Sequence, residues 1–178
     1  MLTHSFYFRT VVHVLITVVS ALLLTGTIVL AVPIKDDPNG FEGIPWGATL
    51  SESDTFKNVE EANSLKTYEL KNGPPMLGPA KVQSMRFITV DDKFARVTVR
   101  YEGKAVHDQI LAFLQLRYGP LDRTPGQFSV GPVKFYAWQG FETEVTLRYE
   151  SRVDRGIIFF ESQALRGKMT DGNSPTVF

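Results

Sequence analysis

Few side chains in this sequence combine a type and a spacing that could perform catalysis. Of its three histidines, His4 and His13 lie in the N-terminal stretch and only His107 lies in the body of the chain. To act as a general base, His107 would need a nucleophile or an acid placed by the fold, and the surrounding sequence supplies no such pairing. We therefore interpret His107 as a structural residue at the core boundary, held by one hydrogen bond.

The acidic pairs Asp91-Asp92 and Glu60-Glu61 are the other candidates, because neighbouring carboxylates can bind a divalent cation. Adjacent carboxylates are usually only solvated, and no calcium-loop pattern surrounds either pair. The sequence has no cysteine, which removes thiolate metal sites, cysteine nucleophiles and disulfides. We expect neither a metal nor a cofactor, and an enzyme would need two carboxylates that the fold brings together in a cleft.

Arginines on predicted strands indicate a binding surface instead. The strand expected over residues 94–101 alternates apolar and polar side chains, so Arg96 and Arg100 should leave the core on the same side. The same alternation over residues 143–149 places Arg148 outward. These three arginines are therefore expected on one face of a sheet.

Aromatic residues join this predicted surface. On the strand over residues 133–138 we assign the outward side to Tyr136 and Trp138. A face that mixes arginines with aromatics is enriched at protein interfaces; the alternative is a solvated face whose long side chains cover apolar surface. Trp46 is either part of a binding surface or a lid on the core, and its large apolar area favours the lid. The candidate binding residues are Arg96, Arg100, Tyr136, Trp138, Arg148 and Trp46.

Hydrophobic periodicity predicts the elements that must position these residues. Thr49 and Glu52 stand at capping-box spacing before a helix over residues 51–62, and a stronger amphipathic helix spans residues 104–118. Strands are predicted over residues 66–71, 82–90, 94–101, 133–138, 143–149 and 156–162. This order, αβββαβββ, predicts an α+β domain in which an antiparallel sheet of about six strands carries two helices on one face.

The N-terminal segment is typical of a targeting segment. No formally charged residue lies between Arg9 and Lys35, and residues 11–31 are dominated by Val, Leu, Ile and Ala. A basic flank before an apolar run that ends at Ala31 indicates an export signal cleaved after Ala31. The alternative is an uncleaved membrane anchor, because the run is long enough to cross a bilayer as a helix. We expect a signal or anchor over residues 1–31, a tether over 32–40, a single domain over 41–166 and a flexible tail over 167–178.

The export segment implies a location and limits the partners. The folded part should be periplasmic, either soluble after cleavage or anchored to the inner membrane by residues 11–31. Membrane contact is then expected only through this segment, where it stays uncleaved. The formal net charge is zero and no long block of like charge stands out, so bulk attraction to nucleic acid is not expected.

Scattered motifs carry a resemblance. The opening Phe41, Gly43, Ile44, Trp46 and Gly47, the run 117–120 (Arg-Tyr-Gly-Pro) and Trp138 together resemble small uncharacterised exported proteins of Gram-negative bacteria. The order of elements is also similar to the helix-plus-strand units of the beta-lactamase inhibitory protein and of small outer-membrane assembly lipoproteins. The resemblance implies a binding module, although the chain lacks the acylated cysteine of the lipoproteins.

Three functions remain open at this point. The first is a non-enzymatic exported cell-envelope domain that binds an envelope protein or another envelope component. It would bind through the sheet face around Arg100, Tyr136, Trp138 and Arg148. The second is a carrier of a small apolar ligand, with a pocket between helix and sheet lined by Phe113, Phe135 and Phe159. The third is an enzyme that uses only carboxylates.

Overall fold

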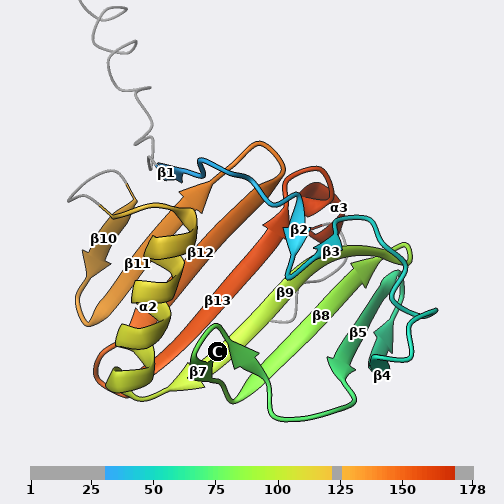
Figure 1. Ribbon diagram of the computed structural model, residues 1–178, viewed down its shortest axis with the longest axis horizontal. Coiled ribbons are helices and arrows are strands. Elements are labelled where there is room, and N and C mark those ends of the chain that lie inside the picture. Colours follow the sequence, from blue (N-terminus) through green and yellow to red (C-terminus); the bar gives the residue numbers. More distant parts are fainter. Residues whose placement is uncertain (1–30, 122–125, 171–178) are drawn as a thin grey trace, which may run out of the picture.

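The chain folds around one large curved sheet with a helix lying across one of its faces (Figure 1). The computed structural model describes residues 31–121 and 126–170. Nine strands form the sheet, in the order β1-β11-β12-β13-β9-β8-β5-β4, with β10 paired to β11 beside β1. These strands are β1 (Val32–Pro33), β4 (Phe56–Ala62), β5 (Leu65–Leu70), β8 (Ser84–Val90), β9 (Lys93–Glu102), β10 (Gln127–Val130), β11 (Val133–Gln139), β12 (Thr143–Glu150) and β13 (Arg155–Ser162).

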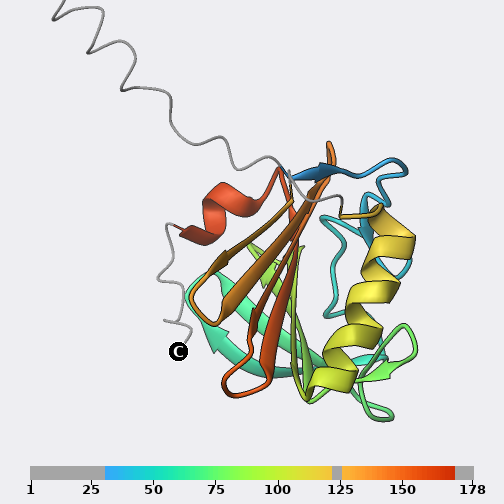
Figure 2. The same cartoon turned by 90° about the vertical axis from the view of Figure 1, so that its left-hand side faces the viewer.

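Smaller elements accompany the sheet and the helix that lies across it. That helix is α2 (Lys104–Tyr118), and a second, five-residue helix is α3 (Arg166–Thr170). Two short hairpins pair β2 (Gly40–Phe41) with β3 (Ile44–Pro45), and β6 (Met76–Leu77) with β7 (Ala80–Lys81). Figure 2 shows α2 on one side of the sheet and α3 on the other.

The predicted fold class is wrong. The described residues are mostly β, and the large sheet is mixed because β1 runs parallel to β11 while the other pairs are antiparallel. The helix predicted over residues 51–62 is absent: residues 51–55 form turns and 56–62 form β4. The structure is therefore not an α+β domain with two helices on one face of an antiparallel sheet.

The strongest periodic patterns were placed correctly. The helix predicted over residues 104–118 is α2, and the strands predicted over residues 82–90 and 94–101 are the antiparallel pair β8 and β9. The three predicted strands of the C-terminal half are β11, β12 and β13. Apolar and polar residues alternate along most of these strands, as in a strand with one buried face. The local sequence pattern is therefore sufficient to predict these strands.

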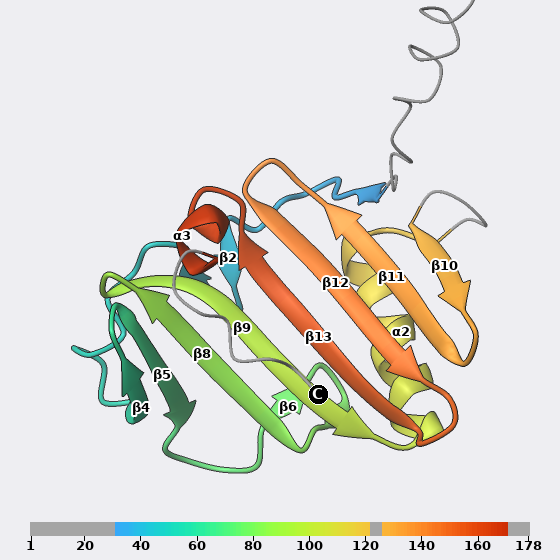
Figure 3. The same ribbon diagram turned by 180° about the vertical axis from the view of Figure 1, so that it is seen from behind.

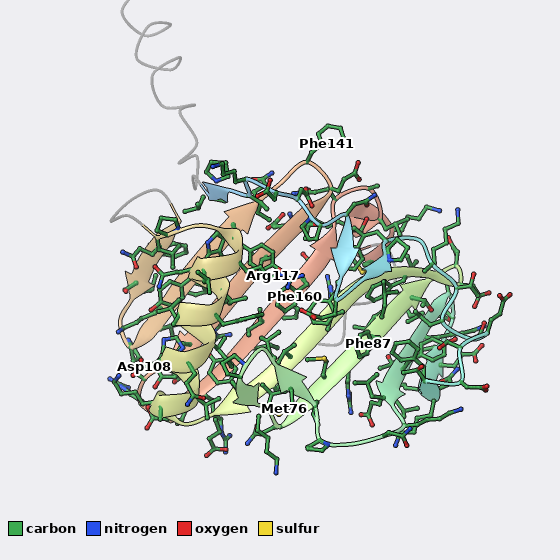
Figure 4. All side chains as sticks on the ribbon, in the orientation of Figure 1. Met76, Phe87, Asp108, Arg117, Phe141 and Phe160 are labelled. Carbon is green, nitrogen blue, oxygen red and sulfur yellow. The ribbon has the colours of Figure 1, made fainter. Side chains whose placement is uncertain are left out.

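The core lies between the sheet and α2. Its largest fully buried side chains include Trp138 on β11, Tyr101 on β9 and Phe160 on β13. Ile110 and Leu114 of α2 pack against these residues and are fully buried. Figure 4 looks onto this side, where Phe160 and Phe87 lie over the sheet. Among the residues that the structure describes, only α3 packs on the opposite face of the sheet, near one end (Figure 3).

The segment predicted as a tether, residues 32–40, joins the sheet. Val32 and Pro33 form β1 against Trp138 and Gln139, and Ile34 is buried in the core. Residues 1–30, which include most of the predicted signal or anchor, lie outside the described residues, as do residues 171–178 of the predicted tail. No helix among the described residues has the length and apolar character that crossing a membrane requires.

The start of the predicted tail forms α3 and packs against the sheet. Met169 is only 2% exposed and contacts Val90 and Ala95 on the side away from α2. Arg166, at the beginning of α3, forms an ion pair with Glu144 of β12. One end of this sheet face is thus covered by α3, and the rest of it faces outward.

Candidate binding surface

We call the face of the large sheet turned away from α2 the open face (Figure 3). Strand register defines it: Phe135, Arg148, Ile157 and Arg100 are successive partners on β11, β12, β13 and β9. Side chains at paired positions of neighbouring strands share a face. These four residues therefore form one row across the open face, near the end of the sheet that carries the β12–β13 turn.

The structure places the three predicted arginines on the open face. Arg96 pairs in register with Glu161, and their side chains form an ion pair there. Arg100 and Arg148 flank Ile157 on either side. Their placement follows from the alternation of β9 and β12, whose other residues fill the core.

The predicted orientation of Tyr136 and Trp138 is wrong. Trp138 is 0% exposed and Tyr136 is 7% exposed, because both point toward α2. The indole nitrogen of Trp138 donates a hydrogen bond to the Gly119 carbonyl at the end of α2, at 2.8 Å. On the open face, β11 presents Phe135 instead, whose ring stacks on Phe128 of β10 with centroids 4.6 Å apart.

Trp46 lies at the margin of the core and not on the open face. Its ring packs against Phe94 with a centroid distance of 4.8 Å, and its indole nitrogen donates to Thr143 Oγ1 at 3.0 Å. It is partly buried and contacts the core cluster on the α2 side. Of its two predicted roles, the contacts of Trp46 fit a lid on the core.

A hollow of about 390 Å³ lies at one end of the sheet, where the β12–β13 turn approaches the end of β9. Arg100 and Arg148 line it from the open face, and Ile157 lies between them. Its lining mixes guanidinium, carboxylate and apolar surface. The lining residues are Gln83, Arg100, Tyr101, Glu102, Arg148, Glu150, Val153, Arg155, Gly156 and Ile157.

Two arginines of the hollow lack a counter-charge. Glu102 accepts a hydrogen bond from Gln83 at 2.8 Å and lies 3.8 Å from the Arg155 guanidinium. Within residues 31–121 and 126–170, neither Arg100 nor Arg148 has an ion-pair partner within 4 Å. They differ in this from the other open-face arginines: Arg86 pairs with Glu69, Arg96 with Glu161, and Arg166 with Glu144.

Exposed apolar side chains adjoin the hollow. Phe128 is 45% exposed and Val130 is 63% exposed on β10, next to the row that contains Phe135 and Arg148. Val153, in the β12–β13 turn, is also exposed and lines the hollow itself. Apolar and aromatic groups beside arginines are the composition of interface cores.

The β10 residues were not found from the sequence. No element is predicted between residues 118 and 133, a stretch rich in glycine and proline, but Gln127–Val130 pair with β11 as an edge strand. The available signal was the alternation of Phe128 and Val130 with Gln127 and Ser129, which repeats in the residues after Gly131. That short alternation, across a Gly-containing turn, is typical of a hairpin.

His107 sits behind the hollow, inside an aromatic cluster of the core. Its ring stacks on Tyr149 at a centroid distance of 3.8 Å, and Nδ1 lies 2.7 Å from the Tyr101 hydroxyl. Burial lowers the pKa of His107 to about 4, with smaller effects of nearby Lys134 and Lys104 in the same direction and of Asp108 in the opposite one. Near neutral pH the ring is uncharged and has a packing role.

The acidic pairs form surface ion pairs. Asp92 accepts a hydrogen bond from Lys66 at 2.7 Å, and Asp91 lies 3.1 Å from Lys168. Glu61 lies 3.9 Å from the same Lys66. In the part of the chain that the structure describes, no three histidine or acidic side chains come together as metal ligands would.

Comparison of the chain with protein-family models, with curated proteins and with solved structures yields no match. The proposed function therefore rests on the geometry of the open face.

Proposed function

We propose that this protein is a non-enzymatic binding module of the cell envelope, and that its open face is the surface that contacts a protein or another envelope component. The observation that carries the proposal is the pair Arg100 and Arg148, which line the hollow beside exposed Phe128 and have no ion-pair partner among the described residues. Arginines and aromatics dominate the binding energy of protein interfaces. Tyr136 and Trp138 do not belong to this surface, because they fill the core.

The chemistry of the remaining polar residues supports binding over catalysis. His107 is neutral and stacked in the core, and Asp91, Asp92 and Glu61 of the acidic pairs form ion pairs with lysines at the surface. The export of the domain is part of this proposal and rests on the apolar residues 11–31.

The carrier hypothesis loses its predicted pocket. Phe113 lies on α2 and packs on the core side, where its ring closes over Gly78. Phe135 and Phe159 point to the other side of the sheet: Phe135 pairs with Arg148, and Phe159 with Thr98 and Thr146. A sheet separates the first ring from the other two, so the three cannot line one pocket.

Site-specific photo-crosslinking tests the proposed surface. A benzophenone amino acid would replace Phe128 on the open face and, as the matched control, Phe141, which is 88% exposed and projects from the β11–β12 turn (Figure 4). In cells of the native host, we expect a discrete crosslinked product from position 128 and none of the same mass from position 141. Equal labelling from both positions, or labelling only from 141, would refute the open face as the binding surface.

A further inference from the structure

We infer that the hollow receives the carboxylate of an acidic side chain from an extended segment of a partner polypeptide, held between Arg100 and Arg148. This inference rests on the proposed function and specifies the chemistry of the partner. Four features of the hollow carry it: the balance of charge, the spacing of the two arginines, the position of Glu150 and the apolar margin.

The charges that line the hollow indicate that the group bound there carries a single negative charge. Three arginines and two glutamates line the hollow, and the contact between Arg155 and Glu102 balances one of each. The remaining groups are Arg100, Arg148 and Glu150, which leaves one positive charge in excess. A carboxylate supplies one negative charge, whereas a phosphate monoester carries close to two near neutral pH.

The two guanidinium groups are placed to approach one group from both sides. Arg148 and Arg100 stand at paired positions on β12 and β9, with Ile157 of β13 between them. Neighbouring strands are about 4.8 Å apart, so the two Cα atoms are separated by roughly 10 Å. Long arginine side chains bridge such a gap easily, and the planar guanidinium matches a carboxylate with two parallel hydrogen bonds.

Glu150 favours a polypeptide over an anionic lipid. Its carboxylate lines the same hollow, and in the described part of the chain no ion pair engages it. A lipid phosphate would face this like charge without offering a donor. An extended peptide carries backbone N–H groups beside its acidic side chain, and these can donate to the Glu150 carboxylate.

The apolar margin is suited to the neighbours of that acidic residue. Val153 lines the hollow, and Phe128 and Phe135 stack beside the row that contains Arg148. In an extended segment the residues next to the acidic one are a few ångströms away along the chain. Apolar residues at those positions would therefore contact Val153, Phe128 and Phe135. The expected recognition element is an acidic residue flanked by apolar ones.

Peptide selection on the full-length chain in a non-ionic detergent tests this inference. A phage-displayed library of random peptides would be selected against the immobilised protein, and the most enriched peptide would be resynthesised with its acidic residue replaced by the amide. The second probe is a set of vesicles of phosphatidylglycerol in phosphatidylcholine. The variants are R100Q, R148Q and E150Q, with R86Q as the matched control, because Arg86 is an open-face arginine already paired with Glu69 and does not line the hollow.

We expect the enriched peptides to contain Asp or Glu beside apolar residues, and the amide version to bind at least about tenfold more weakly. R100Q and R148Q should each lower the affinity for the acidic peptide about tenfold or more, and R86Q should leave that affinity unchanged. E150Q should lower the affinity, because the contact between the Glu150 carboxylate and the peptide backbone is lost. Rising salt should weaken the wild type more than R100Q. Circular dichroism and urea unfolding establish that each variant is folded.

Each contrary result overturns a distinct claim. Peptides without acidic residues that bind R100Q and wild type equally would overturn the carboxylate assignment and leave the open face as a binding surface. Vesicle binding that is lost in R148Q, without any selected peptide, would replace the polypeptide with a lipid headgroup. Failure of both probes, together with crosslinks from position 141 only, would overturn this inference and the proposed function alike.

Discussion

The ring of Tyr101 on β9 lies directly over Gly156 on the neighbouring strand β13. A Cβ atom added at Gly156 would stand 2.0 Å from Tyr101 Cζ, so no side chain fits at this position without moving the ring. Tyr149 flanks Gly156 from the other neighbouring strand, and its ring is parallel to that of Tyr101. Aromatic rings that cover a strand glycine fix the register of the strands around it. This arrangement forms the floor between the core and the hollow.

Gly156→Ala should therefore lower the free energy of unfolding by about 1–3 kcal/mol, measured by urea denaturation, because the added methyl overpacks the Tyr101 ring. Gly167→Ala is the control, since a Cβ there meets nothing within 4 Å. The cost at position 156 should shrink in a Tyr101→Ala background. An unchanged cost in that background would mean that the methyl clashes with something other than the ring.

The buried imidazole of His107 predicts a loss of stability in mild acid. Its pKa is about 4 in the folded chain, mainly because of burial, and about 6.5 when unfolded. Below pH 6.5 the unfolded chain takes up a proton that the folded chain resists, so stability falls until about pH 4 and by about 3 kcal/mol at most. Unfolding free energies from pH 7 to pH 4 should show this decline in the wild type.

His107→Leu isolates that contribution, because leucine cannot titrate. Its stability at pH 7 should be lower than that of the wild type, since the stack on Tyr149 and the bond to Tyr101 are lost. Between pH 6.5 and 4, however, it should lose less stability than the wild type. Parallel pH profiles of the two proteins would show that the pKa of His107 is the same in the folded and the unfolded chain.

Asp37 fastens the N-terminal segment to the β11–β12 turn. Its Oδ2 accepts hydrogen bonds from the backbone nitrogens of Glu142 at 2.6 Å and Thr143 at 3.1 Å, and Gly140 leaves room for the carboxylate. Burial raises the pKa of Asp37, but hydrogen bonds from Thr143, Glu142 and Asn39 outweigh it and lower the pKa below its ordinary value. The carboxylate is therefore stabilising in its ionised form.

Asp37→Ala should cost about 1–2 kcal/mol at pH 7 and increase hydrogen exchange in residues 32–41. Because the folded pKa is depressed, this stabilisation is present above the ordinary pKa of 3.8 and is lost as the pH falls through the folded value. Asp36→Ala, at the exposed neighbouring position, should change neither quantity. Equal effects of the two substitutions would show that the hydrogen bonds to the turn contribute nothing.

Met169 is the buried side chain of α3 on the open-face side, where Arg166 and Lys168 add ion pairs at the surface. Met169 is 2% exposed against Val90 and Ala95, so Met169→Ala should lower the unfolding free energy by about 2 kcal/mol through loss of burial and a residual cavity. Met76→Ala removes the same atoms from a side chain that is 47% exposed and should cost less than about 0.5 kcal/mol. Thermal unfolding of both variants is the measurement, and equal midpoints would place α3 away from the sheet.

Local pattern was enough to predict part of this structure. Helix α2 and strands β8, β9, β12 and β13 each carry sustained periodicity, which a chain segment displays whatever its neighbours are. Arg100 and Arg148 were assigned to one face for the same reason, because alternation along a strand determines which side chains oppose the buried ones. His107 was interpreted as a structural residue from the lack of a catalytic partner, and its position in the core agrees with that interpretation.

The rest was decided by contacts between distant segments. On β11 both sets of alternating positions contain aromatics, so alternation could not tell which set is buried; pairing of Trp138 with Val145 and its bond to Gly119 decide it. Residues 56–62 form a strand because β5 supplies their hydrogen-bond partners. Strand formation depends on such non-local partners more than on intrinsic preference. The hollow forms only when β9, β12 and β13 are aligned, because its lining residues come from all three strands. The same alignment places Arg100 and Arg148 where no described acidic residue pairs with them.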